Sequence, residues 1–393
     1  MALSDAQFDA WRGRRTARLT GVPWLRSKPT RQGTGVVWYV ADEVLVRDQH
    51  VGAAQQVMRG FGHAARDVLD ETAPVPGIRR YKVRGLRSAD VVDEIRRRVG
   101  GVGGAASLNH VLVAAPFQHG GPFGPPAAVA SPSLTFAPST TTPTAHVAVL
   151  DTAMWADSPL PPDSYQATPA DYETEADVDQ DGIVDGEVGH ANFVIGVLRA
   201  HTNAARVSAV RVLDRYGLCT VVELAAALAN LDPSVSVVNL SLGGFTDDGQ
   251  PPEVLRLALR NLLRNRDVVV TAAAGNNGVS DEPYWPAAFA GSREDWSGQV
   301  VSVAAHDGQV VCPWSNTGAW VRVAAPGADV TSTFIHHAEF ASGWALWSGT
   351  SFATPRVSAA IAARMVSGSG AVQATGKVLA DAMMPLSGPY PWL

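Results

Sequence analysis

The sequence predicts an α/β protein, a doubly wound and mostly parallel sheet preceded by a small α+β unit. From residue 145 onward, short continuous apolar runs alternate with segments of helical periodicity, which is typical of parallel strands buried on both faces. A stretch rich in Gly, Pro, Ser and Thr at 116–144 separates these runs from what precedes them. We therefore expect an extension without clear periodicity at 1–35, a small unit at 36–115, a linker at 116–144 and a main domain at 145–393.

The composition favours a packed globular protein and excludes several function classes. Of the 393 residues, 46% are hydrophobic and 17% are charged, with a formal net charge of -6. No basic patch indicates a nucleic-acid partner, and no apolar run of about 18 residues predicts a membrane span. The N terminus lacks the apolar segment of a secretory signal, so we expect a cytoplasmic protein, with export by a non-standard route as the alternative. The two cysteines, Cys219 and Cys312, either pair or are buried thiols.

The small unit shows the order strand, helix, strand, helix, strand. VVWYVADEVLVR at 36–47 predicts one or two strands, and residues 53–69 follow with apolar positions at helical spacing. A short strand is expected at 78–83 and a second helix at 88–99, whose start resembles a helix cap followed by an acidic first turn. HVLVAAP at 110–116 predicts the last strand.

The main domain supplies the strands and helices of the doubly wound sheet. The predicted strands are HVAVLD (146–151), RVSAVRVL (206–213), VSVVNLS (235–241), DVVVTAAA (267–274) and VVSVAAH (300–306). The predicted helices are VVELAAALANL (221–231), PPEVLRLALRNLL (251–263) and SFATPRVSAAIAARM (351–365). In such a fold the ligand site lies at the carboxyl ends of the strands.

Four polar residues stand at element boundaries in a pattern typical of nucleophilic acyl transfer. Asp151 ends a strand, His190 opens a helical segment and Asn276 follows a strand. Ser351 stands where Pro355 requires a helix to begin, and a helix N terminus favours negative charge. Ser351 would attack a carbonyl, His190 would take its proton and Asp151 would orient the imidazole. The amide of Asn276 and the N–H of Ser351 would hold the oxyanion.

The segments HVAVLDT, GHANFVIG, VVNLSLGG, TAAAGNNG and SGTSFATP, in this order, resemble the motifs of subtilisin-like serine proteases, the subtilase family. The resemblance covers residue 145 to about residue 365 and implies a serine endopeptidase that needs no cofactor for its chemistry. The chain departs from the family pattern after His190, where Asn192 and Phe193 replace the usual Thr and His. A peptide-binding or scaffold protein on the same fold is the alternative.

The same resemblance assigns further roles. It implies that a protein or peptide substrate pairs with the backbone of Ser241, Leu242 and Gly243, and that its side chain before the cut bond is walled by Ala273, Ala274 and Gly275. The unit at 36–115 resembles the family propeptide, which implies an intramolecular inhibitor, with the residues after about Pro116 lying in the active site and cut there.

The segment DVDQDGIVD has the spacing of a calcium-binding loop. Its carboxylates stand at positions one, three, five and nine, with Gly182 at position six. The position-twelve Glu of such loops is replaced by Val188, next to Glu187. The segment is either a site for a structural calcium ion or a solvated acidic loop. The candidate ligands are Asp177, Asp179, Asp181 and Asp185.

Overall fold

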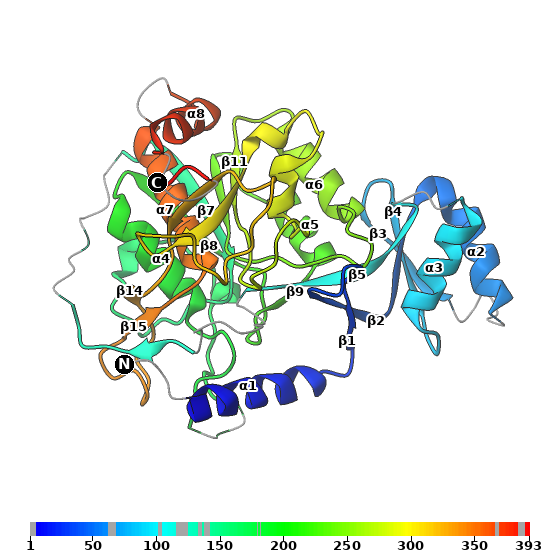
Figure 1. Cartoon of the computed structure of the whole chain (residues 1–393), viewed down its shortest axis with the longest axis horizontal. Coiled ribbons are helices and arrows are strands. Elements are labelled where there is room, and N and C mark those ends of the chain that lie inside the picture. Colours follow the sequence, from blue (N-terminus) through cyan, green and yellow to red (C-terminus); the bar gives the residue numbers. More distant parts are fainter. Residues whose placement is uncertain are drawn as a thin grey trace.

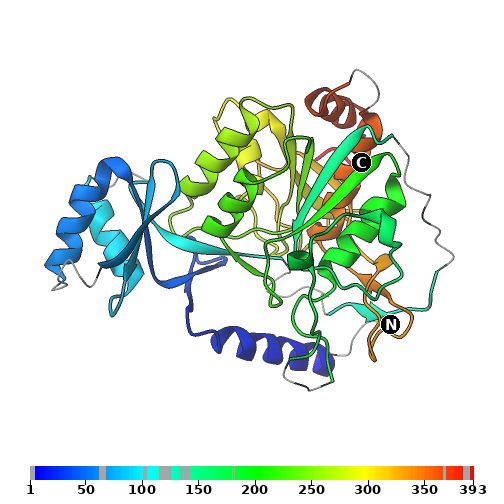
Figure 2. The ribbon, with the colours of Figure 1, turned by 180° about the vertical axis from the view of Figure 1, so that it is seen from behind.

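The computed structural model describes residues 5–61, 68–100, 104–114, 125–132, 136, 142–178, 180, 182–365, 369–383 and 390–393. A small N-terminal domain sits beside a larger α/β domain, and one strand, β5 (Ala106–Val113), runs from the first toward the second (Figure 1). Helix α1 (Asp5–Thr20) lies along the larger domain, away from the rest of the small domain. The view from behind shows the same arrangement (Figure 2).

The larger domain is built on a sheet of six parallel strands, which confirms the predicted fold class. The strand order is β13-β12-β11-β10-β7-β8, so the first strand of the domain lies inside the sheet. These strands are apolar on both faces because helices cover both. Their bounds are β7 Ala145–Asp151, β8 Ala205–Arg211, β10 Val237–Leu240, β11 Val269–Ala273, β12 Val300–His306 and β13 Val323–Pro326.

Two hydrophobic cores lie on the two faces of this sheet. One contains apolar residues of α4 (His190–His201), α7 (Thr350–Arg364) and α8 (Ala371–Asp381), and the other those of α5 (Val221–Ala229) and α6 (Glu253–Leu263). The first core takes one set of alternating strand residues, such as Val147 and Val149, and the second takes the set between them. The predicted strands and helices of this domain are present at nearly the expected bounds.

The small domain is an antiparallel sheet of order β3-β4-β2-β5-β9, with β1 paired to β2. The helices α2 (Val51–Gly60) and α3 (Ser88–Arg98) share one core with β2, β4 and β5. The strand bounds are β1 Leu25–Pro29, β2 Val36–Arg47, β3 Val68–Val75 and β4 Ile78–Val83. The edge strand β9 (Leu218–Thr220) belongs to the larger domain, so the two domains share this sheet.

The extension at 1–35 contains α1 and β1, although its sequence shows no apolar stripe. Two expectations for the residues after it were wrong. The helix expected at 53–69 ends at Gly60, and its last expected residues lie in β3, which pairs with β4. The strand expected at 110–116 begins earlier, at Ala106. In each case, contacts with distant parts of the chain outweigh local pattern.

A third, small sheet has the order β14-β15-β6, with bounds Val330–Thr333, Trp344–Trp347 and Ala127–Ala128. Cys219 and Cys312 are both free, buried thiols. None of the helices described here is long and apolar enough to cross a membrane.

Candidate active site

Asp151 and His190 are joined by a short hydrogen bond at the carboxyl end of the central sheet. Asp151 is the last residue of β7 and His190 the first of α4. The His190 Nδ1 lies 2.6 Å from Asp151 Oδ1, and the same oxygen accepts from the Thr152 N–H at 2.7 Å. These contacts fix the tautomer with hydrogen on Nδ1 and leave Nε2 as the basic nitrogen.

The His190 imidazole is fully buried beneath aromatic side chains. Trp347 packs edge-on against it at 5.6 Å between ring centroids, and Phe352 lies at 5.5 Å. Burial lowers the pKa of His190, but the charge and the hydrogen bond of Asp151 outweigh burial and raise the pKa above its ordinary value. Among the described residues, Nε2 has no hydrogen-bond partner. The basic nitrogen of His190 therefore makes no hydrogen bond to the Ser351 hydroxyl in this state.

The departures after His190 are accommodated by packing and hydrogen bonds. The side chain of Asn192 donates to the Trp155 carbonyl and accepts from the Trp155 N–H, both at 2.9 Å, which ties α4 to the loop after β7. Phe193 lies 4.4 Å from Phe352 between ring centroids and joins the aromatic cluster under the imidazole. Both residues thus brace the helix that carries His190.

Ser351 lies in the first turn of α7, as Pro355 predicts. Pro355 has no N–H, so the Ser351 carbonyl loses its partner four residues on. The hydroxyl of Ser241 replaces that partner and donates to the Ser351 carbonyl at 2.8 Å. Ser241 is held in turn by Asn239, whose amide donates to it at 3.0 Å. A strand of the central sheet therefore fixes the start of the serine helix.

The Asn276 side chain is oriented toward the same helix start. Its Oδ1 accepts from the Thr350 N–H at 2.8 Å and from the Thr350 hydroxyl at 2.9 Å. With Oδ1 used, the amide's donor Nδ2 is the group left for a substrate oxygen. The Ser351 N–H, in the first turn, makes no bond within its own helix. Asn276 is thus joined to the residue that precedes Ser351, and the predicted oxyanion role of the two donors stays a prediction.

Among the six residues expected to bind substrate, Ser241 bonds to Ser351 and Gly243 contacts the N-terminal domain. Gly243 and Val113 exchange two backbone hydrogen bonds, of 2.8 Å and 3.0 Å, so β5 is added to the Ser241–Gly243 segment as an antiparallel strand. The other edge of β5 pairs with β9, and Ala114 N–H donates to the Gly217 carbonyl at 3.0 Å. A strand of the chain itself therefore occupies the position expected for an extended peptide.

The remaining expected pocket residues lie at the end of β11 and directly after it. Ala273 ends β11, and the buried residues Ala274 and Gly275 lead from it into Asn276. Gly275 has a φ of +94, and a side chain there would collide with the amide of Asn316. The Gly275 N–H donates to the Thr350 hydroxyl at 3.1 Å. This segment is thereby joined to the start of α7.

The strand β5 ends at the nucleophile. The Ser351 hydroxyl donates to the Ala114 carbonyl at 3.0 Å and also lies 3.2 Å from the Ser241 carbonyl. The hydroxyl is therefore directed at the N-terminal domain and not at His190 in this state. Motif spacing did not predict this contact, since it depends on how the two domains dock.

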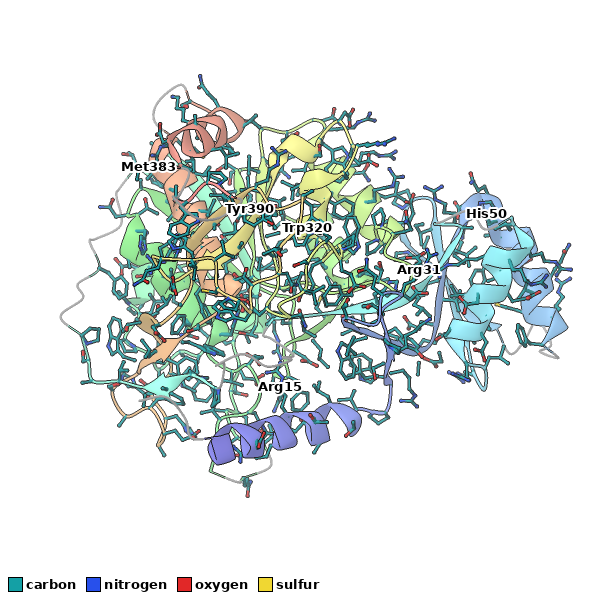
Figure 3. The ribbon with its side chains drawn as sticks, in the orientation of Figure 1. Arg15, Arg31, His50, Trp320, Met383 and Tyr390 are labelled. Atoms are coloured by element: carbon teal, nitrogen blue, oxygen red, sulfur yellow. The ribbon has the colours of Figure 1, made fainter. Side chains whose placement is uncertain are left out.

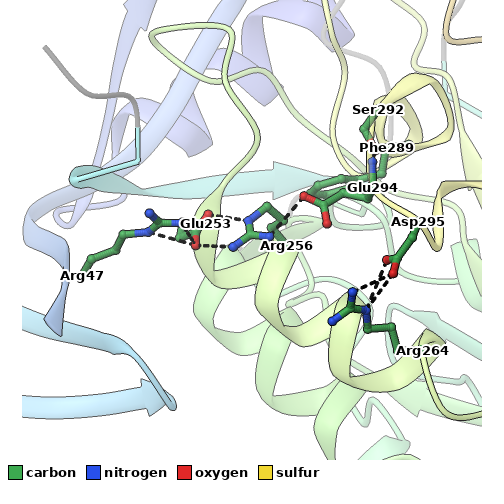
Figure 4. A network of polar contacts seen from close by, with 8 residues as sticks. All are labelled: Arg47, Glu253, Arg256, Arg264, Phe289, Ser292, Glu294 and Asp295. Atoms are coloured by element: carbon green, nitrogen blue, oxygen red, sulfur yellow. Dashed lines mark hydrogen bonds and ion pairs between the residues drawn. The ribbon is translucent and has the colours of Figure 1, made fainter. Parts of the chain in front are cut away.

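Ion pairs hold the small domain against the larger one. Figure 4 shows Arg47 of β2 donating to Glu253 at 2.9 Å, and Glu253 also binding Arg256. A second cluster is centred on the buried Asp247, whose side-chain partners from the N-terminal part of the chain are Lys28, Arg96 and His110. Sequence reasoning missed both clusters, because the partners are far apart along the chain.

The predicted calcium loop is partly used by α1. Asp179 and Asp181 lie outside the described residues. Asp177 accepts from the Gly182 N–H at 2.8 Å, whereas Asp185 pairs with Arg18 of α1 at 2.6 Å. No group of three or more His, Cys, Asp or Glu able to hold a metal occurs within the part of the chain that the structure describes. A guanidinium thus engages Asp185 here, and calcium binding stays a prediction.

Comparison with known proteins agrees with this geometry. The model of the subtilase family matches residues 143–379. The chain belongs to the subtilase family. This confirms the resemblance predicted from the motifs and accounts for the doubly wound α/β fold of the larger domain.

Several curated subtilases are similar over part of their length. A thermophilic serine proteinase of Bacillus sp. (strain AK1) is 36% identical over 190 residues, which cover 45% of this chain and 42% of that protein. Thermitase of Thermoactinomyces vulgaris is 32% identical over 191 residues, covering 46% of this chain and 62% of thermitase. The match thus spans less than two thirds of either relative. Among solved structures, a cold-adapted subtilisin-like serine proteinase has a TM-score of 0.47 at 23% identity, covering 65% of this chain and 89% of that one.

Proposed function

We propose that this subtilase is a serine endopeptidase in which Asp151, His190 and Ser351 form the catalytic triad. The Ser351 Oγ attacks the carbonyl carbon of the substrate while His190 Nε2 takes its proton. His190 then gives that proton to the leaving amine, so the peptide bond breaks and an acyl-enzyme remains. A water molecule, deprotonated by His190, hydrolyses the ester and restores the serine. The 2.6 Å contact of Asp151 with His190 supports the orienting role of the carboxylate.

Stabilisation of the oxyanion falls to Asn276 and the Ser351 N–H. The negative oxygen of the tetrahedral intermediate would accept from the Asn276 Nδ2 and from this N–H at the positive end of α7. The bonds from Thr350 to Asn276 Oδ1 preorganise the amide before substrate arrives. These steps use protein side chains and backbone alone.

The N-terminal domain is proposed to inhibit the enzyme and to be cut from it. The observation that carries this proposal is the position of β5. Val113 pairs with Gly243, and the Ala114 carbonyl accepts a hydrogen bond from the Ser351 hydroxyl. While β5 stays there, a peptide substrate has no edge to pair with and the nucleophile is turned from its base. We expect the chain to cut itself close to Ala114 and to become active when the domain leaves.

A fluorophosphonate probe tests the proposed chemistry, because it bonds covalently to an activated serine. We expect labelling of the processed protein that disappears in Ser351→Ala and is strongly reduced in His190→Ala. Ser369→Ala, which removes an exposed hydroxyl that bonds to Gln373, is the matched control and should label like the parent protein. A processed protein that does not label would overturn the proposal and favour a peptide-binding role.

A further inference from the structure

An acidic side chain lies near Ala114, the residue that follows β5 and contacts Ser351. Glu187 stands three positions before His190, and its side chain is 1% exposed. A β-carbon built on Gly217 would lie 2.5 Å from Glu187 Cγ and 3.5 Å from Ala114 Cβ. Glu187 and Ala114 therefore flank the same glycine, whose carbonyl accepts from the Ala114 N–H.

The carboxylate of Glu187 is occupied by a cation from the N-terminal helix. The Arg15 guanidinium of α1 donates to Glu187 Oε1. Figure 3 shows Arg15 between α1 and the larger domain. The second oxygen, Oε2, is buried and has no hydrogen-bond partner among the described residues. A buried carboxylate held on one side by a guanidinium has a free acceptor on the other.

A cavity adjoins the residues on either side of Glu187. Ala114 brings only a methyl group to its position beside Gly217. A cavity of about 290 Å³ separates α1 from the loop before His190, with Arg15, Gly186, Val188 and Trp347 in its wall. Trp347 also contacts the His190 ring, so this space borders the catalytic centre.

We propose that Glu187 is a specificity-determining residue that accepts the Lys or Arg side chain of a peptide substrate at the position of Ala114. In the full chain Arg15 fills this acidic subsite in place of a substrate cation. The inference rests on the proposed function, because a cut near Ala114 removes α1 and Arg15 with the inhibitory domain. The carboxylate then faces the groove beside the substrate strand and lacks its counter-charge.

The first test needs no catalysis and uses the full chain with Ser351→Ala. Ala114→Lys adds a cation next to Arg15, and we expect it to lower the unfolding temperature by a few degrees. Combining it with Arg15→Ala should recover most of that loss, because the introduced ammonium takes the place of the guanidinium on Glu187. The recovery should vanish when Glu187→Gln is also present. Purely additive effects of the two substitutions would overturn the inference, whatever the activity of the protein.

The second test uses the processed enzyme and quenched fluorescent peptides with the sequence of residues 109–118. Position 114 is Lys, Ala or Glu, and active enzyme is counted by fluorophosphonate labelling. We expect kcat/KM to be about tenfold or more higher for Lys than for Ala, since charged hydrogen bonds are the strong ones, and lowest for Glu. Glu187→Gln should abolish this ratio.

The ratio between two peptides on one enzyme does not depend on how much protein is folded, so a general structural defect leaves it unchanged. Glu253→Gln, which also removes a carboxylate bound by an N-terminal arginine, is the matched control and should keep the preference. An equal Lys-to-Ala ratio in the parent and in Glu187→Gln would overturn the inference. If no peptide is cut and no probe reacts, the proposed function fails. The unfolding temperatures of the first test still show whether Glu187 accepts a cation at position 114.

Discussion

The hydroxyl of Ser351 donates a hydrogen bond to the carbonyl oxygen of Ala114, 3.0 Å away, across 237 residues of sequence. Ala114 directly follows the strand that pairs with Gly243, so the contact depends on the docking of the whole N-terminal domain. The same serine has its backbone carbonyl fixed by Ser241. The state of the nucleophile is therefore set by one contact from the small domain and one from the central sheet, and these can be perturbed separately.

Ser241→Ala should destabilise the protein by about 1–3 kcal/mol, because it leaves the buried carbonyl of Ser351 without a partner. Urea unfolding of the Ser351→Ala chain measures this effect without self-digestion. Pro355→Ala restores an N–H that can bond to that carbonyl, so the double substitution should be less destabilised than Ser241→Ala alone. If Pro355→Ala adds to the damage, the explanation given for Ser241 is wrong.

Asp247→Asn should weaken the docking of the small domain. Burial raises the pKa of Asp247, but His110 and Arg96 outweigh it and hold the pKa below its usual range. A carboxylate with a lowered pKa contributes stability that is complete above about pH 4 and is lost as pH falls through the lowered value. We expect a loss of about 3 kcal/mol at neutral pH, at the low end for a broken buried pair because Asp248 stays 3.0 Å from Arg96.

Urea unfolding at several pH values measures the effect of Asp247→Asn. The difference between the parent and the variant should shrink in strong acid, as the Asp247 carboxylate becomes protonated. A difference that grows as pH falls below 4 would contradict the assigned sign.

The activity of the processed enzyme should rise with pH through a midpoint above about 6.5, the ordinary pKa of histidine. Although burial lowers the pKa of His190, Asp151 raises it further, and the base works only when neutral. The same shift means that His190 contributes to folding stability below about pH 6.5 and that this contribution is lost as pH rises through the raised pKa. The pH profile of kcat/KM checks the prediction, and a midpoint below 6 would contradict it.

Arg15→Gln should make the intact chain shorter-lived. Removing the guanidinium leaves the buried Glu187 without its partner and loosens α1, so the N-terminal part should leave sooner. The half-life of the full chain on a gel measures this effect. Arg14→Gln, at the neighbouring position of the same helix, serves as the control and should change the half-life little. An unchanged half-life in Arg15→Gln would show that α1 does not hold the inhibited state.

Local pattern was sufficient for most of the larger domain and for the placement of its polar residues. Asp151, His190 and Ser351 stand at the ends of buried elements, and a parallel sheet brings such ends to one edge. Helix α1 could not be predicted in this way, because its sequence has no apolar stripe. The bonds from Arg15 and Arg18 reach carboxylates more than 160 residues away, at Glu187 and Asp185. The same holds for the Ala114 contact, which exists only once both domains are folded.

Mass spectrometry of the purified full chain over time tests the central claim most directly. The account predicts that the parent protein breaks once between Ala114 and Pro116, giving a new N terminus at Ala115 or Pro116, and that its peptidase activity rises as the break appears. The Ser351→Ala chain should stay intact and inactive under the same conditions. The same break in both proteins, or a parent chain that is fully active while still intact, would contradict the account.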